Sequence, residues 1–176
     1  MQEFTIRPAS RADVTAIAAV MRESVEQFGP AAYTEHQVAS ALTFICRPDE
    51  QLIDDGTYFV AMIDGEIAGC GGWSRRQKVY SGSAASSDEN ALLDASTDAA
   101  RIRAMFVRPR WSRRGIGRAV LQHSETRAAA EGFCRFQLVA MRSAGTLYES
   151  CGYRAVREAP ITLEDGVVLE CTLMEK

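Results

Sequence analysis

Histidine is scarce in this chain, and the cysteines lack metal-site spacing. The 176 residues include two histidines and five cysteines, and no two cysteines form a C-x-x-C pair. A structural zinc site needs about four such ligands placed close together. We therefore expect no metal, and we expect the scattered cysteines to be reduced, as they are in a cytoplasmic protein.

An excess of positive charge and a long apolar run are also missing. The formal net charge is -3, whereas a general nucleic-acid binder is usually basic across one face. No apolar run approaches the roughly 18 residues that span a bilayer, and the first residues lack the basic start of a signal peptide. We expect a cytoplasmic protein that acts on neither nucleic acid nor membrane.

What remains is the composition of one globular domain. Hydrophobic residues make up 47% of the chain and charged residues 24%, which is ordinary for a soluble fold with a substantial core. We expect residues 1–176 to form a single domain. Residues 76–98, rich in Ser, Ala and Asp, are interpreted as a long mobile loop within it.

The hydrophobic period changes repeatedly along the chain and predicts a mixed α/β fold. Helical spacing occurs over residues 14–28, 35–45, 116–131 and 144–151. Alternating or β-rich segments occur over residues 4–7, 57–63, 66–73, 100–107, 135–140, 153–156 and 167–174. This order predicts an α/β fold, an α+β sandwich with a mixed sheet of about seven strands flanked by about four helices.

Two strands carry further information. Gly69, Gly71 and Gly72 interrupt the strand over residues 66–73 and predict a bulge or a close backbone approach. Strict alternation over residues 100–107 would divide that strand into two faces. One face would hold Ala100, Ile102, Ala104 and Phe106, and the other Arg101, Arg103, Met105 and Val107.

An arginine-rich turn is the strongest candidate binding site. The segment Arg108–Arg118 contains five arginines beside Gly115 and Gly117, where a strand passes into a helix. Glycine lets the backbone approach a phosphate, a helix N-terminus offers free N–H groups, and arginine matches phosphate oxygens. The chain lacks the Lys-Ser/Thr pair of a P-loop, and Val120 stands where a dinucleotide fingerprint needs its third glycine. Nucleotide chemistry of those two kinds is therefore excluded.

Two motifs resemble those of the GNAT (GCN5-related) N-acetyltransferases. Val107-Arg108-Pro109 followed by Ser-Arg-Arg-Gly-Ile-Gly at 112–117 is similar to the family's pyrophosphate loop, V-x-P and [Q/R]-x-x-G-x-[G/A]. Tyr-Glu-Ser-Cys-Gly-Tyr at 148–153 is similar to its Y-E-x-x-G-[F/Y] signature. The resemblance covers nearly the whole chain. Ser112 stands where the family usually has Gln or Arg, and Met141 stands where many members carry Asn.

The resemblance implies the GNAT fold, acetyl-CoA as cofactor and CoA as product. It assigns the CoA diphosphate to the loop residues Arg113, Arg114, Gly115, Ile116, Gly117 and Arg118. It implies that the strand carrying Met105, Phe106 and Val107 splays from its neighbour and pairs with the pantetheine arm. It makes Tyr148 the general acid that protonates the departing thiolate after direct attack by a primary amine in a ternary complex.

The general base stays open, because Arg101 and Arg103 occupy the face on which many members place a glutamate. A guanidinium cannot accept a proton at neutral pH. Asp98, Glu35, His36 or a chain of waters are the candidates, and His36 has the most suitable ordinary pKa, about 6.5.

The acceptor also stays open. Arg101 and Arg103, with Arg75 and Arg76 nearby, either bind an acceptor bearing a carboxylate or phosphate or are solvated charges at the strand edge. Trp73 either lines the acceptor pocket or belongs to the core. The acceptor would be the amine of a small molecule, an amino acid or a peptide.

One alternative function and one expectation about assembly accompany this interpretation. The chain could bind acyl-CoA without turnover, as a sensor or interaction module. A homodimer is expected because many relatives dimerise.

Overall fold

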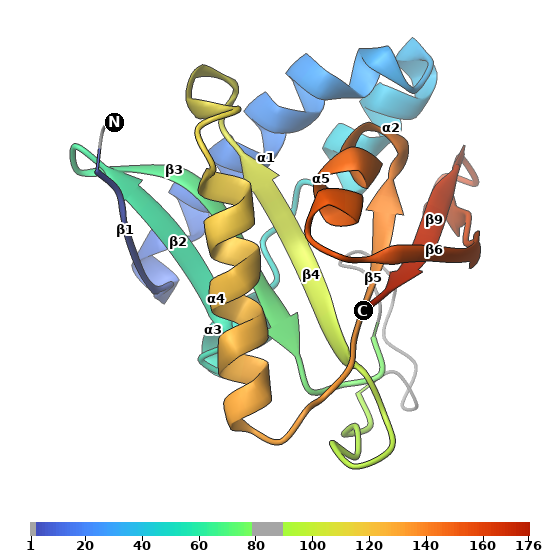
Figure 1. Ribbon diagram of the computed structural model, residues 1–176. Helices are drawn as coiled ribbons and strands as arrows, with labels where there is room; N and C mark the ends of the chain where they lie inside the picture. The colour runs from blue at the N-terminus through green and yellow to red at the C-terminus, as the bar shows by residue number, and fades with distance from the viewer. Residues whose placement is uncertain (1–2, 79–89) are drawn as a thin grey trace.

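The computed structural model describes residues 3–78 and 90–176 and contains a seven-stranded sheet with helices on both faces (Figure 1). The strand order is β1-β2-β3-β4-β5-β9-β6. The strands are β1 (Thr5–Pro8), β2 (Tyr58–Ile63), β3 (Glu66–Ser74), β4 (Ala100–Val107), β5 (Phe136–Met141), β6 (Arg154–Glu158) and β9 (Cys171–Glu175). The α/β class and the mixed sheet are therefore as predicted. Of the expected mobile loop, residues 79–89 lie outside the described part of the chain, whereas its two ends are described and joined by a bridge between Arg76 and Leu92.

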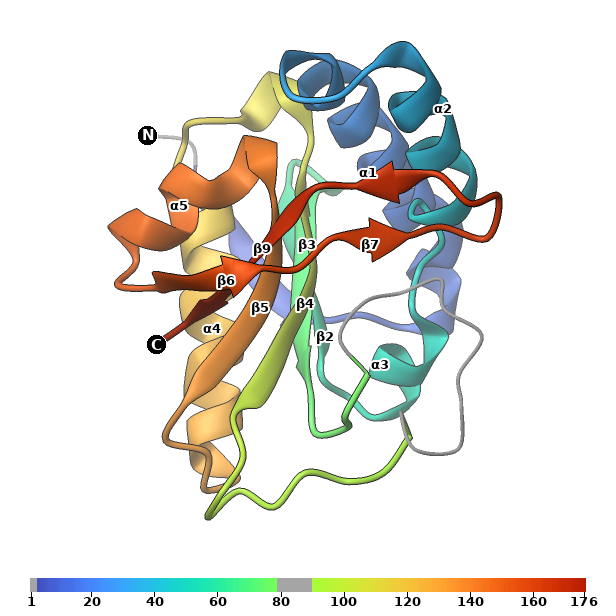
Figure 2. The same cartoon turned by 90° about the vertical axis from the view of Figure 1, so that its right-hand side faces the viewer.

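Five α-helices cover the sheet. They are α1 (Val14–Phe28), α2 (Glu35–Phe44), α3 (Glu50–Asp54), α4 (Ile116–Ala130) and α5 (Gly145–Ser150). In Figure 2, α4 and α5 lie on one side of the sheet and α1 and α2 on the other.

The start of α2 is a capping box formed by Thr34 and Gln37. The Thr34 hydroxyl accepts from the backbone N–H of Gln37, and the Gln37 side chain accepts from the N–H of Thr34. Helix α3 was not expected, because its five residues are too few to show a helical period. Its only local sign is Asp49, whose carboxylate accepts from the N–H of Gln51 as an N-cap.

The last predicted strand, residues 167–174, is wrong as a single element. It divides into β8 (Val168–Leu169) and β9, and β8 pairs with β7 (Ile161–Thr162) in a separate ribbon. Side chains of α2 hold this ribbon away from the sheet. Gln37 Nε2 donates to the carbonyl of Val168 at 2.8 Å, and Ser40 Oγ donates to Asp165 Oδ2 at 2.7 Å.

A bulge in β4 contradicts the predicted alternation of that strand. Gly72 is paired with Arg103 and Cys70 with Phe106, so two residues of β4 lie opposite the single residue between them in β3. Ala104 occupies the bulge with a φ of 53°.

The bulge changes which side chains share a face. Before it, Ile102 packs in the core cluster beneath α4. After it, Ala104 and Phe106 pack against the cluster beneath α1 and α2, and Met105 and Val107 face α4. Ala100 and Ile102 therefore do not share a face with Ala104 and Phe106.

The glycines of β3 explain how the bulge is accommodated. A Cβ on Gly71 would lie 2.1 Å from the sulfur of Met105, and one on Gly69 would lie 2.9 Å from Ile116 Cγ2. Side chains of β4 and α4 thus occupy the space that a Cβ would fill, and the register shift between Cys70 and Gly72 bears out the bulge predicted from the sequence.

No helix in the described part of the chain is both long and apolar enough to cross a membrane. Residues 3–78 and 90–176 contain no group of three or more His, Cys, Asp or Glu placed to hold a metal ion.

Gly72 offers a test of this packing. A Cβ there would lie 2.3 Å from the Thr57 carbonyl oxygen and 3.0 Å from the Cα of Tyr58, and neither backbone atom can rotate away. We expect Gly72→Ala to lower the free energy of unfolding by about 2 to 3 kcal/mol in urea denaturation. Gly145→Ala is the control, because a Cβ there has no neighbour within 4 Å. Equal effects of the two changes would contradict this packing.

Candidate active site

The central strands β4 and β5 separate and leave a cavity between them. They are paired in parallel only at Ala100–Phe136 and Arg101–Gln137, and beyond those pairs they diverge (Figure 1). The cavity has a volume of about 880 Å³ and is lined by residues of both strands. On β4 the lining includes Met105, Phe106 and Val107. The predicted splaying of β4 is therefore confirmed.

The glycine loop closes one end of the cavity. Arg113 and Gly115 adopt positive φ, 62° and 83°, and α4 begins at Ile116. The first hydrogen bond of this turn runs from the N–H of Ala119 to the carbonyl of Gly115 at 2.9 Å. The N–H groups preceding Ala119 in the helix have no acceptor within it, and they lie at the positive end of the helix dipole. Arg113, Gly115, Ile116, Gly117 and Arg118 all line the cavity, so this end suits a diphosphate.

The five arginines of the turn divide into two groups. Arg108 forms ion pairs with Glu23 and Glu66, and Arg110 pairs with Glu66. Their positive charge is thus compensated on the outer surface.

The second group lies at the loop itself. Arg113, Arg114 and Arg118 are exposed, and Arg113 and Arg118 line the cavity. Arg118 Nη2 donates to Ser150 Oγ at 3.1 Å, which joins the first turn of α4 to α5. Arg114 lies beside them without lining the cavity.

Tyr148 is placed on the wall of the same cavity by α5. It is 6% exposed, and its ring packs edge-on against Tyr153 with centroids 5.9 Å apart. Burial raises the pKa of Tyr148 well above the ordinary value of about 10. The phenol therefore stays protonated at neutral pH and can serve as a proton donor.

Neither candidate base lies with Tyr148. His36 is exposed on α2, and Asp98 precedes β4 and accepts from the N–H of Asp94 at 2.8 Å. Both are absent from the cavity lining, which contains no Asp, Glu or His among the described residues. Glu35 is likewise outside the lining.

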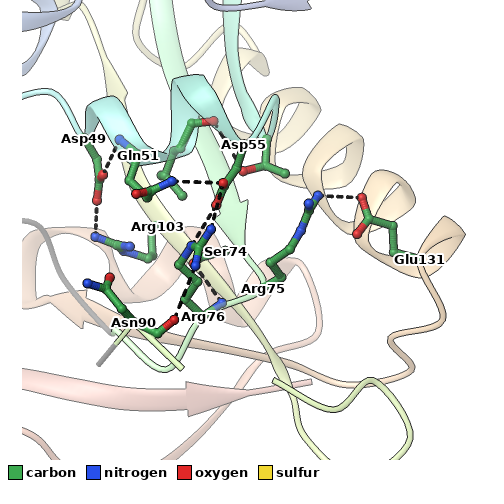
Figure 3. A network of polar contacts seen from close by, with 11 residues as sticks. Asp49, Gln51, Asp55, Ser74, Arg75, Arg76, Asn90, Arg103 and Glu131 are labelled. Carbon is green, nitrogen blue, oxygen red and sulfur yellow. Dashed lines mark hydrogen bonds and ion pairs between the residues drawn. The ribbon is translucent and has the colours of Figure 1, made fainter. Parts of the chain in front are cut away.

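The arginines proposed for an anionic acceptor have partners within the protein (Figure 3). Arg103 lines the cavity, but its side chain is 2% exposed and forms an ion pair with Asp49. Arg76 pairs with Asp55 at 3.0 Å. These two pairs fasten α3 to the strands beside it.

The remaining members of that set are also engaged. Arg75 pairs with Glu131 at 2.8 Å, and Arg101 donates to the side chain of Gln137. Trp73 is 1% exposed, packs against Phe133 at 5.6 Å between ring centroids, and does not line the cavity. Trp73 therefore belongs to the core.

Tyr58 does not line the cavity but supports the bulge of β4, a role that sequence reasoning missed. Its single O–H proton is shared between the carbonyl of Ala104 at 3.2 Å and the sulfur of Cys70 at 3.3 Å. Full burial raises the pKa of Tyr58 well above its ordinary value, so the donor stays protonated. The bond satisfies the carbonyl that the bulge removes from regular pairing. A lone tyrosine in an apolar strand carries no sequence signal for this role.

Comparison with known proteins identifies the class that this fold and site define. Residues 17–153 match the model of the acetyltransferase (GNAT) family. The chain belongs to the GNAT family and is an acetyltransferase, as the two sequence motifs predicted. No curated relative matched significantly.

Solved structures share the fold at low sequence identity. A GCN5-related N-acetyltransferase from Rhodopseudomonas palustris aligns with a TM-score of 0.75 at 20% identity, covering 100% of this chain and 96% of that one. The PaiA N-acetyltransferase from Thermoplasma acidophilum, in complex with coenzyme A, aligns with a TM-score of 0.66 at 16% identity, covering 99% and 98%. YncA from Salmonella typhimurium, with its cofactor acetyl-CoA, aligns with a TM-score of 0.63 at 18% identity, covering 98% and 92%.

Gly115 allows the loop to be tested apart from general stability. Gly115→Ala and Gly56→Ala both place an L residue at positive φ, 83° and 70°, with no atom within 4 Å of the new Cβ. Each should cost about 1 to 2 kcal/mol of stability. Only Gly115→Ala should weaken CoA binding in titration calorimetry, by about tenfold or more, because only its loop would hold the diphosphate. Equal CoA affinity in the two variants would contradict this assignment.

Proposed function

We propose that this protein transfers the acetyl group of acetyl-CoA to a primary amine of a small molecule or peptide, by direct attack in a ternary complex. The observation that carries the proposal is one continuous cavity. It extends from the glycine loop, past Tyr148, to residues of α1 and to Ile45, the residue after α2, on the other face of the sheet. Two ligands can therefore enter from opposite faces and meet between β4 and β5.

The side of the cavity toward α4 suits the cofactor. The loop offers backbone N–H groups and the charges of Arg113 and Arg118 to phosphates. Beyond Arg101, β4 is not paired with β5, so its edge toward β5 offers backbone groups to the amides of a pantetheine arm. These features support binding of the whole CoA molecule in an extended conformation.

Tyr148 supplies the proton that the reaction needs. The acceptor nitrogen forms a bond to the acetyl carbon, the carbon–sulfur bond breaks, and the phenol protonates the departing sulfur. The proton lost by the nitrogen then restores the phenol through solvent. The products are an N-acetylated amine and CoA with a free thiol, so atoms and charge balance.

The missing carboxylate in the lining indicates how the amine is activated. No described lining residue is an Asp, Glu or His, so no such side chain stands ready to deprotonate an ammonium group in the cavity. The acceptor would enter as the neutral amine, which an apolar surrounding favours. Its own pKa then controls how much of it can react.

Replacing the Tyr148 hydroxyl tests the proposed acid. Tyr148→Phe should lower kcat by about 10²- to 10⁴-fold in a thiol-release assay at neutral pH, with CoA affinity little changed. Tyr153→Phe is the matched control, since Tyr153 is buried beside Tyr148 but does not line the cavity.

A small effect of Tyr148→Phe on kcat would contradict the assignment of Tyr148 as the general acid. Tight CoA binding without thiol release for any amine in the wild-type protein would favour the alternative of a non-catalytic acyl-CoA sensor.

The pH dependence should follow the acceptor and not an enzyme base. The raised pKa of Tyr148 keeps it protonated above pH 10, so kcat/KM should show no falling limb between about pH 6.5 and 9.5. It should rise with the fraction of neutral amine, and its inflection should move between two amines of different pKa. An inflection near pH 6.5 common to both amines would indicate a histidine base instead.

A further inference from the structure

The acceptor half of the cavity is apolar. Beyond the split strands, toward α1 and α2, it is lined by Met21, Val25, Phe28, Ile45, Ile161 and Leu169. Phe28 is partly exposed at the C-terminal end of α1, whereas Met21 and Val25 are buried deeper along the same helix. The residues come from three separate parts of the chain and form one surface.

The β7–β8 ribbon closes this compartment from outside. It extends from the β9 side of the sheet toward α2 (Figure 2). The Ser40–Asp165 bond at 2.7 Å fastens its turn, and the phenol of Tyr33 donates to the carbonyl of Glu170 at 2.7 Å. The first bond joins the turn of the ribbon to α2, and the second joins the residue after β8 to the segment before α2. Ile161 and Leu169 of the ribbon line the cavity.

Charge is almost absent from this half. Arg103 is its one charged residue among the described lining residues, and the positive charge is matched by Asp49 in a buried ion pair. On α1, Ser24 is the uncharged polar side chain among the lining residues. A second ammonium or a carboxylate on the acceptor would be buried without a counterion, which is costly. A hydrocarbon substituent would instead displace water from apolar surface.

We propose that the acceptor is a primary amine with a compact apolar substituent and no second charge. The inference rests on the transferase function proposed above and names the substrate class of the same site. It replaces the interpretation in which Arg101 and Arg103 receive an anionic group.

Three amines of similar length separate these classes: pentylamine, putrescine and 4-aminobutyrate. In a thiol-release assay with saturating acetyl-CoA, kcat/KM for pentylamine should exceed that for the other two by about 30-fold or more. A wild-type preference for putrescine or 4-aminobutyrate would overturn the proposal.

Phe28 and Phe44 provide a matched pair of variants. Both are partly buried phenylalanines on the α1–α2 side, but Phe44 does not line the cavity. Phe28→Ala should lower kcat/KM for pentylamine by about tenfold with unchanged CoA affinity, and Phe44→Ala should leave it within about twofold. Equal losses in the two variants would contradict a specific contact with Phe28.

Ser24 allows a gain of function. Ser24→Asp would place a carboxylate in the lining from a partly exposed position on α1. The ratio of kcat/KM for putrescine to that for pentylamine should rise by about tenfold or more, because the second ammonium gains a counterion. An unchanged ratio would contradict binding of the acceptor beside Ser24 on α1.

Binding measured without turnover keeps this proposal distinct from the transferase function. Titration of the same amines into the CoA-saturated protein should give the same ranking. Preferred binding of pentylamine without acetyl transfer would overturn the transferase function and support the apolar pocket. Binding that favours putrescine or 4-aminobutyrate would overturn the proposal that the acceptor pocket prefers an apolar substituent.

Discussion

The site depends on the bulge in β4, which the hydrogen bond from the Tyr58 phenol to the Ala104 carbonyl stabilises. At this point β4 takes an extra residue relative to β3, and Ala104 adopts positive φ. A bulge bends its strand and increases the local twist, which fits the divergence of β4 from β5 after only two paired residues. The same bulge turns Phe106 toward α1 and Met105 toward α4. One irregularity thus opens the cavity and supplies walls on both faces.

Arginines serve the fold in one region and the ligand in another. Arg103 and Arg76 pair with carboxylates at the two ends of α3, and removing one partner of a buried pair leaves an uncompensated charge. These arginines are therefore structural first, although Arg103 borders the cavity. Arg113 and Arg118 remain at the end where phosphates are expected. The cavity is consequently polar at the cofactor end and apolar at the acceptor end.

Features encoded in short contiguous segments could be predicted from the sequence. The Thr34 cap, the glycine loop and the Tyr148 motif are of this kind, because neighbouring residues determine their geometry. The bulge at Ala104 could not be predicted, because it depends on which residues of β3 lie opposite. The apolar compartment joins α1 and the end of α2 to the β7–β8 ribbon, which follows them by more than a hundred residues. Local sequence patterns do not show which distant segments meet in the fold. The sequence therefore pointed to the nearby charges of Arg101 and Arg103 as the acceptor site.

The meeting of both substrates between β4 and β5 is tested most directly by a crystal structure of the protein with CoA and pentylamine. The CoA diphosphate should lie on the loop before α4, and the CoA sulfur should lie within hydrogen-bonding distance of the Tyr148 hydroxyl. The pentyl chain should occupy the compartment lined by Met21, Val25 and Phe28. A CoA sulfur remote from Tyr148, or an amine bound outside the split strands, would contradict this mechanism.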